Sequence, residues 1–395
     1  MKQFSKRINL VSDTIDKKDL ASLSEWMLQD ETPKLTKGPL TIEFEKKWSS
    51  WLGVKGSVFV NSGSSAILLA LASLKEAGYL KSDKIVVPTL SWLTDVSSPM
   101  QIGLSPILCD CNLYDLSVDI NHLEKIFAEE NPSAFILVSA LGLVPDMDKI
   151  SKLCKEYDVL LIEDVCESMG SSYNGQKLGT HGIVSLFSFY YGHHLSTIEG
   201  GMISTNDEEL LNIMISMRSH GWDRDWTESR KTEYRQKHNV SEFDAMYTFY
   251  YPGYNLRSTD LQAFIGIMQI DKLDNFIKTR QKNFFEYENM LRNINGLDIS
   301  VRPSDCISNF AYPFLAPTTE SRNRIVKALM QNDVEVRPLI AGSMGKKPFW
   351  VKHKGYSQSF NNADQINILG FYIPNHQDLT VEDISLVTKI IKENI

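Results

Sequence analysis

Short apolar runs alternate with stretches of helical spacing from about residue 57 onward. Several of the runs are apolar on both faces, which is typical of strands in a parallel sheet that helices cover. Between the first two runs, residues 67–74 place their apolar side chains at helical spacing, and this helix is expected to end near Gly78. The alternation predicts an α/β fold with a mostly parallel sheet. The expected strands are Ser57–Val60, Lys84–Val87, Pro106–Cys109, Ala134–Ser139, Val159–Ile162, Val184–Phe189 and Gly201–Ser204.

The pattern changes after Tyr254. Thr259 and Gln262 have the spacing of a capping box, and they open a long helical pattern that runs to Gly296. Beyond it the strands are fewer and mix with helices, which predicts a smaller α+β domain at the C-terminal end. We therefore expect a large domain over residues 1–272 and a small domain over residues 273–395. The N-terminal segment could pack on either domain.

Composition and charge narrow the function classes. The chain has 395 residues with 41 Lys and Arg against 49 Asp and Glu, and its net charge of −8 argues against nucleic-acid binding. No apolar run approaches the roughly 20 residues of a membrane span, and the N-terminus lacks the apolar core of a signal peptide. The five cysteines form no metal-binding pattern and suggest reduced thiols. These features predict a cytoplasmic protein that binds neither nucleic acid nor membrane.

Candidate chemistry follows the expected strands, because ligands of parallel sheets collect at the carboxyl ends of the strands. The segment Asn61–Ser65 lies between the first strand and the first helix of the alternating pattern, where glycine and a helix N-terminus could hold an anion. The alternative is a simple corner with serine as the helix cap. Trp92 follows the next strand and could stack on a planar ring, although such a residue is more often part of the core.

Two further candidates lie at later strand ends. Asp164 ends a very apolar strand and could hold a protonated heteroaromatic nitrogen, while the alternative is an ordinary cap or ion pair. The adjacent His193 and His194 could be metal ligands, could supply a general base, or could belong to a solvated turn. Because adjacent side chains on a strand point apart, a shared metal is disfavoured and one working histidine is the better interpretation. No metal site is expected.

Along the chain the motifs come in the order Ser-Gly-Ser, then Trp, then Glu-Asp, then a Ser-Phe segment that leads to Glu-Gly-Gly. Motifs in this order resemble those of the sugar aminotransferase family of fold type I pyridoxal-phosphate enzymes. The segments Val144–Ile150 and Tyr254–Arg257, the latter followed by Gln262–Gly266, also match the family. The resemblance covers nearly the whole chain, and it implies the fold type I aminotransferase fold.

One position departs from the family pattern. The family's lysine, which forms a Schiff base with pyridoxal phosphate, lies five residues after the position of Ser188, and His193 stands there. Imidazole cannot form that imine, so the resemblance implies a cofactor, pyridoxal or pyridoxamine phosphate, that is held without a covalent link. Histidine at this position marks the family's 3-dehydratase branch. The segments Ser219–Arg224 and Ala341–Trp350 are similar to the corresponding segments of those 3-dehydratases that act on GDP-linked sugars. A related branch adds an iron–sulfur cluster, which five scattered cysteines cannot bind.

The resemblance therefore implies a 3-dehydratase. Such an enzyme takes an amino group from L-glutamate and converts a nucleotide-linked 4-keto-6-deoxy sugar into a 4-keto-3,6-dideoxy sugar. His193 would be the catalytic base, because its ordinary pKa of about 6.5 suits proton transfer near neutrality. Asn255 resembles a residue that reaches the cofactor phosphate from the neighbouring subunit, which implies a homodimer with shared sites. The implied cofactor-binding residues are Gly63, Ser64, Trp92, Asp164, Glu167, Ser188 and Asn255; the substrate-binding candidates are His220, Arg224, Arg257 and Arg337; Cys166 and His194 are expected to be structural.

Other functions stay open at this point. A nucleotide-sugar aminotransferase acting at C4 or C3 would share every feature except His193. A non-catalytic nucleotide-sugar binder would not need the complete set of ring contacts. A metal-dependent hydrolase using His193 and His194 would lose its activity to chelators and would show no cofactor chromophore. The sequence also leaves open a hexose or heptose sugar and GDP or CDP as the nucleotide.

Overall fold

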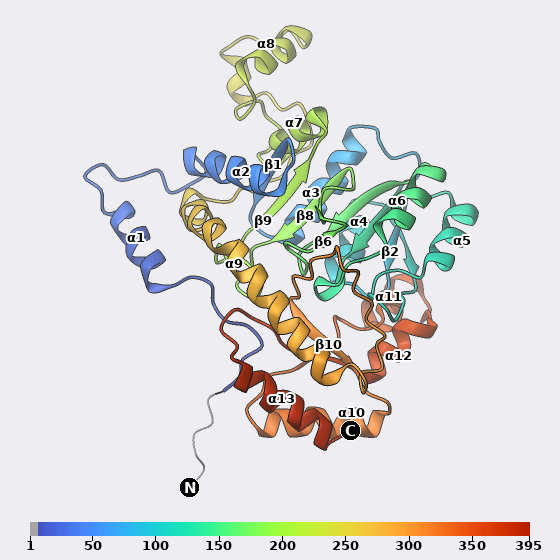
Figure 1. Cartoon of the computed structure of the whole chain (residues 1–395). Coiled ribbons are helices and arrows are strands. Elements are labelled where there is room, and N and C mark those ends of the chain that lie inside the picture. The colour runs from blue at the N-terminus through green and yellow to red at the C-terminus, as the bar shows by residue number, and fades with distance from the viewer. Residues whose placement is uncertain (1–6) are drawn as a thin grey trace.

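The computed structural model describes residues 7–395, and a seven-stranded sheet forms its centre (Figure 1). The strand order is β1-β9-β8-β5-β4-β2-β3, and in this sheet only β9 runs antiparallel to its neighbours. The mostly parallel sheet predicted from the apolar runs is confirmed, and every expected strand lies within two residues of an observed one. The strands are β1 Gly56–Val60, β2 Lys84–Pro88, β3 Ser105–Cys109, β4 Ala134–Val138, β5 Leu160–Asp164, β8 Val184–Ser188 and β9 Gly201–Thr205.

Helices cover this sheet, as the α/β pattern predicted (Figure 1). The helix expected over residues 67–74 is part of α3, which begins earlier because the Ser62 hydroxyl caps it by accepting from the Ser65 N–H at 3.1 Å. The helices before residue 240 are α1 Lys17–Met27, α2 Pro39–Leu52, α3 Gly63–Glu76, α4 Leu93–Gln101, α5 Ile120–Glu130, α6 Met147–Glu156, α7 Glu208–Met217 and α8 Glu228–Lys237, with the 3₁₀ turn η1 Ala140–Gly142. A short hairpin joins β6 Ser172–Tyr173 to β7 Gln176–Lys177.

The long helix α9, Asp260–Leu291, connects the large sheet with the C-terminal part of the chain. Thr259 and Gln262 form the capping box that their spacing predicted. The C-terminal part has the expected α+β character, with an antiparallel sheet in the order β10-β12-β11. A domain boundary at residues 272–273 stays a prediction, and it would fall inside α9. The remaining elements are η2 Asp244–Tyr247, β10 Ala311–Leu315, α10 Thr319–Gln331, β11 Arg337–Pro338, η3 Met344–Lys346, α11 Pro348–Lys354, α12 Asn361–Leu369, β12 Gly370–Pro374 and α13 Val381–Glu393.

The N-terminal segment contacts both parts of the molecule. Ile8 pairs with Val334 next to β11, and the Leu10 N–H donates to a Glu335 carboxylate oxygen at 3.0 Å. A few residues later, the Thr14 hydroxyl accepts from the Ser196 N–H at 3.2 Å, in the loop that follows β8. The segment therefore links the C-terminal sheet to a loop at the edge of the large sheet.

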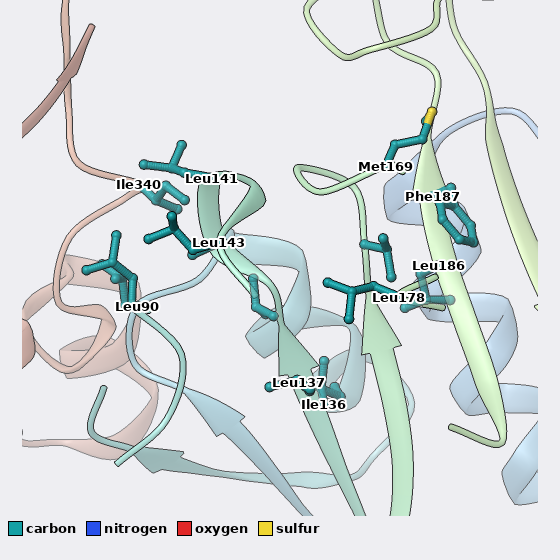
Figure 2. Close-up of a cluster of buried hydrophobic side chains, with 14 of the residues drawn as sticks. Leu90, Ile136, Leu137, Leu141, Leu143, Met169, Leu178, Leu186, Phe187 and Ile340 are labelled. Atoms are coloured by element: carbon teal, nitrogen blue, oxygen red, sulfur yellow. The ribbon is translucent and has the colours of Figure 1, made fainter. Parts of the chain in front are cut away.

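Buried apolar side chains join the C-terminal part to the same sheet edge. Figure 2 shows Ile340 beside Leu141 and Leu143, which follow β4, and all three are buried. Burial of each such side chain contributes about 1.5–3 kcal/mol. The Met344 N–H also donates to the Thr89 carbonyl just after β2, at 3.0 Å. The C-terminal part is thus held against the carboxyl ends of the strands. None of the helices in residues 7–395 is long and apolar enough to cross a bilayer.

Candidate active site

The predicted site residues follow strands whose carboxyl ends share one edge of the sheet. Because β2, β4, β5 and β8 all run parallel, the residues after each of them meet at that edge. Trp92 lies after β2, Asp164 is the last residue of β5, and Ser188 is the last residue of β8. The N-terminus of α3 follows β1, which has the same direction. The fold therefore gathers four of the candidate positions.

The start of α3 and Ser188 form a phosphate cradle, made of Gly63, Ser64 and Ser188, and two glycines leave the space for it. A Cβ at Gly63 would lie 2.7 Å from the Ser188 Cβ and 3.1 Å from its Oγ, and a Cβ at Gly201 would lie 2.6 Å from the Gly63 nitrogen. The absence of both side chains lets the first turn of α3 approach Ser188 closely. The Ser64 hydroxyl lies 3.5 Å from that of Thr94. A helix N-terminus beside a serine hydroxyl has the donor set that a phosphate monoester needs.

Trp92 is placed as a flat, accessible surface at this edge. It is the residue before α4, and its side chain is 60% exposed, whereas a core tryptophan would be covered. Its backbone N–H donates to the Asp95 carboxylate at 3.1 Å, which fixes the start of the helix. The structure thus favours the ring-stacking interpretation of Trp92 over core packing.

Asp164 lies in an unusually acidic environment. One of its oxygens accepts from the Cys166 N–H at 2.9 Å, and its side chain is in hydrogen-bonding contact with that of Asp95. Burial and the neighbouring Asp164 raise the pKa of Asp95 well above its usual range. Burial, followed by Asp164, also raises the pKa of the Cys166 thiol, which keeps it neutral and agrees with a structural role.

Glu167 is a carboxyl group that stays protonated at neutral pH. It accepts a hydrogen bond from the Leu141 N–H at 2.9 Å, and Leu141 has a backbone φ of +50°. Desolvation raises its pKa from 4.5 to about 8, with a further contribution from the charge of Asp164. A protonated carboxyl can donate as well as accept, so Glu167 can serve either kind of ligand oxygen.

We expect Glu167→Gln to stabilise the cofactor-free protein as the pH rises. The unfolded chain releases the Glu167 proton near pH 4.5, while the native protein keeps it up to about pH 8, so stability of the parent falls over this range. Glutamine keeps the acceptor for Leu141 and has no proton to lose. The stability difference should grow by roughly 2–4 kcal/mol between pH 5 and 8, from about 1.4 kcal/mol per pKa unit reduced by solvent screening. Urea unfolding at a series of pH values measures it, and a constant difference would contradict the assignment.

The two adjacent histidines have different environments. His194 is buried, and its Nε2 lies 3.0 Å from the Ser308 carbonyl, which agrees with the structural role expected for it. His193 packs against Phe310, with ring centroids 5.3 Å apart, and no group in residues 7–395 hydrogen-bonds its Nδ1. Burial, with a smaller effect from Arg280, lowers the pKa of His193 to about 4. His193 is therefore a neutral imidazole with a free nitrogen at pH 7.

A buried polar network that sequence reasoning missed holds Phe310 in place. The Arg280 guanidinium is 1% exposed and donates to the carbonyls of Phe310, at 3.1 Å, and of Asn375. The Asn375 amide in turn donates to the Asn309 carbonyl and to the Arg280 carbonyl, both at 3.1 Å. Arg280 belongs to α9, where a single arginine within a helical pattern gives no sequence signal of a role near the site.

The segment that carries Asn255 and Arg257 lies next to the end of β1. Asn255 pairs with Ser219, and the Arg257 Nε donates to the Asn255 side-chain oxygen at 3.0 Å. His220 lies beside the same segment, because its N–H donates to the Tyr254 carbonyl at 2.6 Å. The structure therefore brings His220, Asn255 and Arg257 together, with Asn255 exposed.

The other two arginine candidates lie in different places. Arg224 lies between α7 and α8, and its guanidinium is 3.7 Å from the centroid of the Trp222 ring. Helix α8 protrudes from the rest of the molecule (Figure 1). Arg337 is exposed on β11, is paired with Glu335, and lies opposite Tyr372 of β12. Burial raises the pKa of Tyr372, and the charges of Glu167 and Arg337 also act on it. Tyr372, for which the sequence has no motif, therefore lies beside Arg337.

The described residues do not contain a cluster that suits a metal. In residues 7–395, no group of three or more His, Cys, Asp or Glu side chains is arranged to hold a metal ion. The five cysteines are free thiols, three of them buried. The geometry instead provides an anion cradle, an exposed indole, an acidic group and a neutral imidazole.

The fold and this arrangement define a pyridoxal-phosphate enzyme of fold type I. The chain belongs to the DegT/DnrJ/EryC1/StrS aminotransferase family, whose model matches residues 14–392. It is similar to GDP-4-keto-6-deoxy-D-mannose 3-dehydratase of Yersinia pseudotuberculosis, with 31% identity over 97% of this chain and 98% of the relative. The resemblance and the fold inferred from the sequence motifs are confirmed.

The chain is also similar to solved structures of a GDP-4-keto-6-deoxymannose-3-dehydratase. A mutant of GDP-4-keto-6-deoxymannose-3-dehydratase with bound GDP-perosamine has 29% identity and a TM-score of 0.87, covering 98% of this chain and 100% of its own. Another structure of that enzyme contains a trapped PLP-glutamate geminal diamine, with the same identity and TM-score over 97% of this chain and 100% of its own.

Proposed function

We propose that the protein is a 3-dehydratase that requires pyridoxal or pyridoxamine phosphate and uses L-glutamate. Its substrate would be a GDP-linked 4-keto-6-deoxy sugar and its product a 4-keto-3,6-dideoxy sugar. The observation that carries the proposal is His193, a neutral imidazole at the position where the family's aminotransferases have their Schiff-base lysine. The similarity to relatives named as GDP-4-keto-6-deoxy-D-mannose 3-dehydratase supports the substrate and the glutamate.

The residues at the sheet edge fit the cofactor. Gly63, Ser64 and Ser188 would hold its phosphate. Because Gly63 has no side chain, the space beside Ser188 stays open, whereas a side chain at this position would fill it. Trp92 would stack on the ring, and Asp164 would pair with the ring nitrogen. Glu167, protonated at pH 7, would donate to the phenolic oxygen. When bound, pyridoxal phosphate supplies an electron sink that stabilises negative charge on an attached carbon.

Residues of this chain would then carry the proton transfers. The unpaired Nδ1 of His193 accepts a proton as the C3 hydroxyl of the sugar leaves. Overall, the sugar and glutamate give the 3-deoxy sugar, 2-oxoglutarate and ammonia, which balances atoms and electrons. His220, Arg257, Arg224 and Arg337 are the candidates for the carboxylate of glutamate and the diphosphate of the sugar nucleotide, since arginine binds both bidentately.

We further propose a homodimer with shared sites. Asn255 is exposed beside the end of β1, so it is available to reach a neighbouring subunit's phosphate cradle. Free, unpaired thiols suit a reducing compartment, which supports a cytoplasmic location.

The proposed function is tested by cofactor attachment and by product. The purified protein should bind pyridoxal phosphate without a covalent link, so borohydride treatment should leave no pyridoxyl-lysine. With glutamate and GDP-4-keto-6-deoxymannose, mass spectrometry should find the 3-deoxy product. An aminated sugar would instead identify an aminotransferase, and a labelled lysine would contradict the role given to position 193. Turnover that disappears with chelators and needs no cofactor would favour a metal-dependent hydrolase.

A further inference from the structure

Asp95 is a buried carboxyl group next to the candidate active site, and the proposed reaction assigns no role to it. It lies in the first turn of α4, three residues after Trp92, and is 1% exposed. One of its oxygens accepts from the Trp92 N–H at 3.1 Å, and its side chain is in hydrogen-bonding contact with that of Asp164. A single side chain therefore touches both residues that we assign to the cofactor ring.

The groups around Asp95 are acidic on each side. Asp164, at the end of β5, affects Asp95 more strongly than any other charged group, and Glu167 and the Cys166 thiol follow on the same segment. Two carboxylates in contact, one of them buried, repel each other strongly, so the pair holds one proton between them. A carboxylate that pairs with a protonated ring nitrogen must itself be ionised. The shared proton therefore belongs on Asp95.

We propose that Asp95 is a positioning residue that holds the proton shared with Asp164 and ties this carboxylate to the backbone of Trp92. The pair then presents one negative charge to the single positive charge of a protonated ring nitrogen. Its hydrogen bonds also fix the carboxylate relative to the stacking indole. This inference rests on the proposed function where it assigns Trp92 and Asp164 to the ring, whereas the shared proton is a property of the cofactor-free protein.

The shared proton is tested without cofactor by thermal unfolding of the parent and of Asp95→Asn between pH 5 and 8. The unfolded chain releases the proton of Asp95 near pH 4, while the native protein retains it, so stability of the parent falls as the pH rises. Asparagine accepts from Trp92 and donates to Asp164 as the protonated acid does, but it has no proton to lose. The melting temperature of Asp95→Asn relative to the parent should therefore increase steadily with pH. Parallel curves would overturn the shared proton.

The positioning role is tested by pyridoxal phosphate binding, followed through quenching of protein fluorescence. Asp95→Asn should bind within about threefold of the parent, and Asp95→Ala should bind at least about tenfold more weakly because both hydrogen bonds are lost. Asp19→Asn is the matched control. Asp19 is likewise a buried carboxylate in the first turn of a helix that accepts from the N–H of the residue before that helix, but it pairs with Lys272 on α9. This variant should be less stable and should bind the cofactor normally.

The outcomes separate the two proposals. If Asp95→Asn binds as weakly as Asp95→Ala, the ionised form of Asp95 is required and the inference fails. If both variants bind like the parent, Asp95 has no positioning role. A parent that binds no pyridoxal phosphate but shows the pH-dependent stability difference would refute the proposed function and support the proton-sharing pair.

Discussion

His193→Asn should lose sugar dehydration while it keeps the cofactor. Asparagine has a similar size but cannot accept a proton near neutral pH, and a well-placed base typically contributes about 10²–10⁴ in rate. Burial and Arg280 lower the pKa of His193 to about 4, so its imidazole is unprotonated at pH 7 and free to accept a proton, although it is a weaker base than the ordinary pKa of histidine implies. The residues assigned to the phosphate and the ring lie elsewhere, at the start of α3, just before α4, at or just after the end of β5, and at the end of β8. Binding of pyridoxal phosphate should therefore change little.

The measurement is the rate of 3-deoxy product formation with glutamate, together with the dissociation constant of the cofactor. His353→Asn is the control, because His353 is exposed on α11 and should tolerate the change at the parent rate. Dehydration at an unchanged rate in His193→Asn would show that another group is the base.

Gly201→Ala should severely weaken cofactor binding, although Gly201 is not one of the residues assigned to the cofactor. The new Cβ would lie 2.3 Å from the Ser62 carbonyl and 2.6 Å from the Gly63 nitrogen, both backbone atoms at the start of α3. Such contacts force the first turn of the helix away from Ser188, at a cost of about 1–3 kcal/mol. Because this distortion displaces the residues of the phosphate cradle, the affinity for the cofactor should fall by about 10–100-fold. Calorimetric titration with pyridoxal phosphate measures the change.

Gly56→Ala is the matched control. Gly56 lies at the other end of the β1–β9 ladder, where a Cβ would be 2.3 Å from Leu211 Cδ2, the end of a flexible side chain. This variant should lose some stability and bind the cofactor like the parent. Equal losses of cofactor affinity in the two variants would show that general destabilisation, and not the cradle, explains Gly201→Ala.

The sequence predicted the large sheet well because its strands are continuous apolar runs bounded by polar turns. The observed β5 extends to Asp164, two residues beyond the expected strand, since backbone pairing with β4 continues past the last apolar side chain. The small elements β6, β7 and β11 were not predicted, because two-residue strands are made by tertiary pairing and carry no pattern of their own. Likewise, helix α8 was not predicted, because it is polar on all sides and lacks the apolar face by which a helix is recognised in a sequence.

The candidate site divides in the same way. Positions at strand ends could be predicted, since the order of motifs along the chain matches the order of strands. Asp95, Arg280 and Tyr372 could not, because their importance depends on contacts with residues far away in sequence. For Asp95 a signal did exist, because a carboxylate in the first turn of a helix often accepts from the N–H of the residue before that helix, as Asp95 does from Trp92. Such a position identifies a helix start but does not reveal the second carboxylate that lies opposite.

The loop that carries His193 also has a consequence for how the protein is made. Its neighbours are secured by Thr14, 182 residues before Ser196, and by Ser308, 114 residues after His194. Contacts of such large sequence separation form slowly, because a long stretch of chain must be closed first. During synthesis, the loop and the sheet edge exist well before residue 308 leaves the ribosome. The nascent chain therefore carries its His193 loop without its final support, and this region should be among the last to acquire protection from hydrogen exchange.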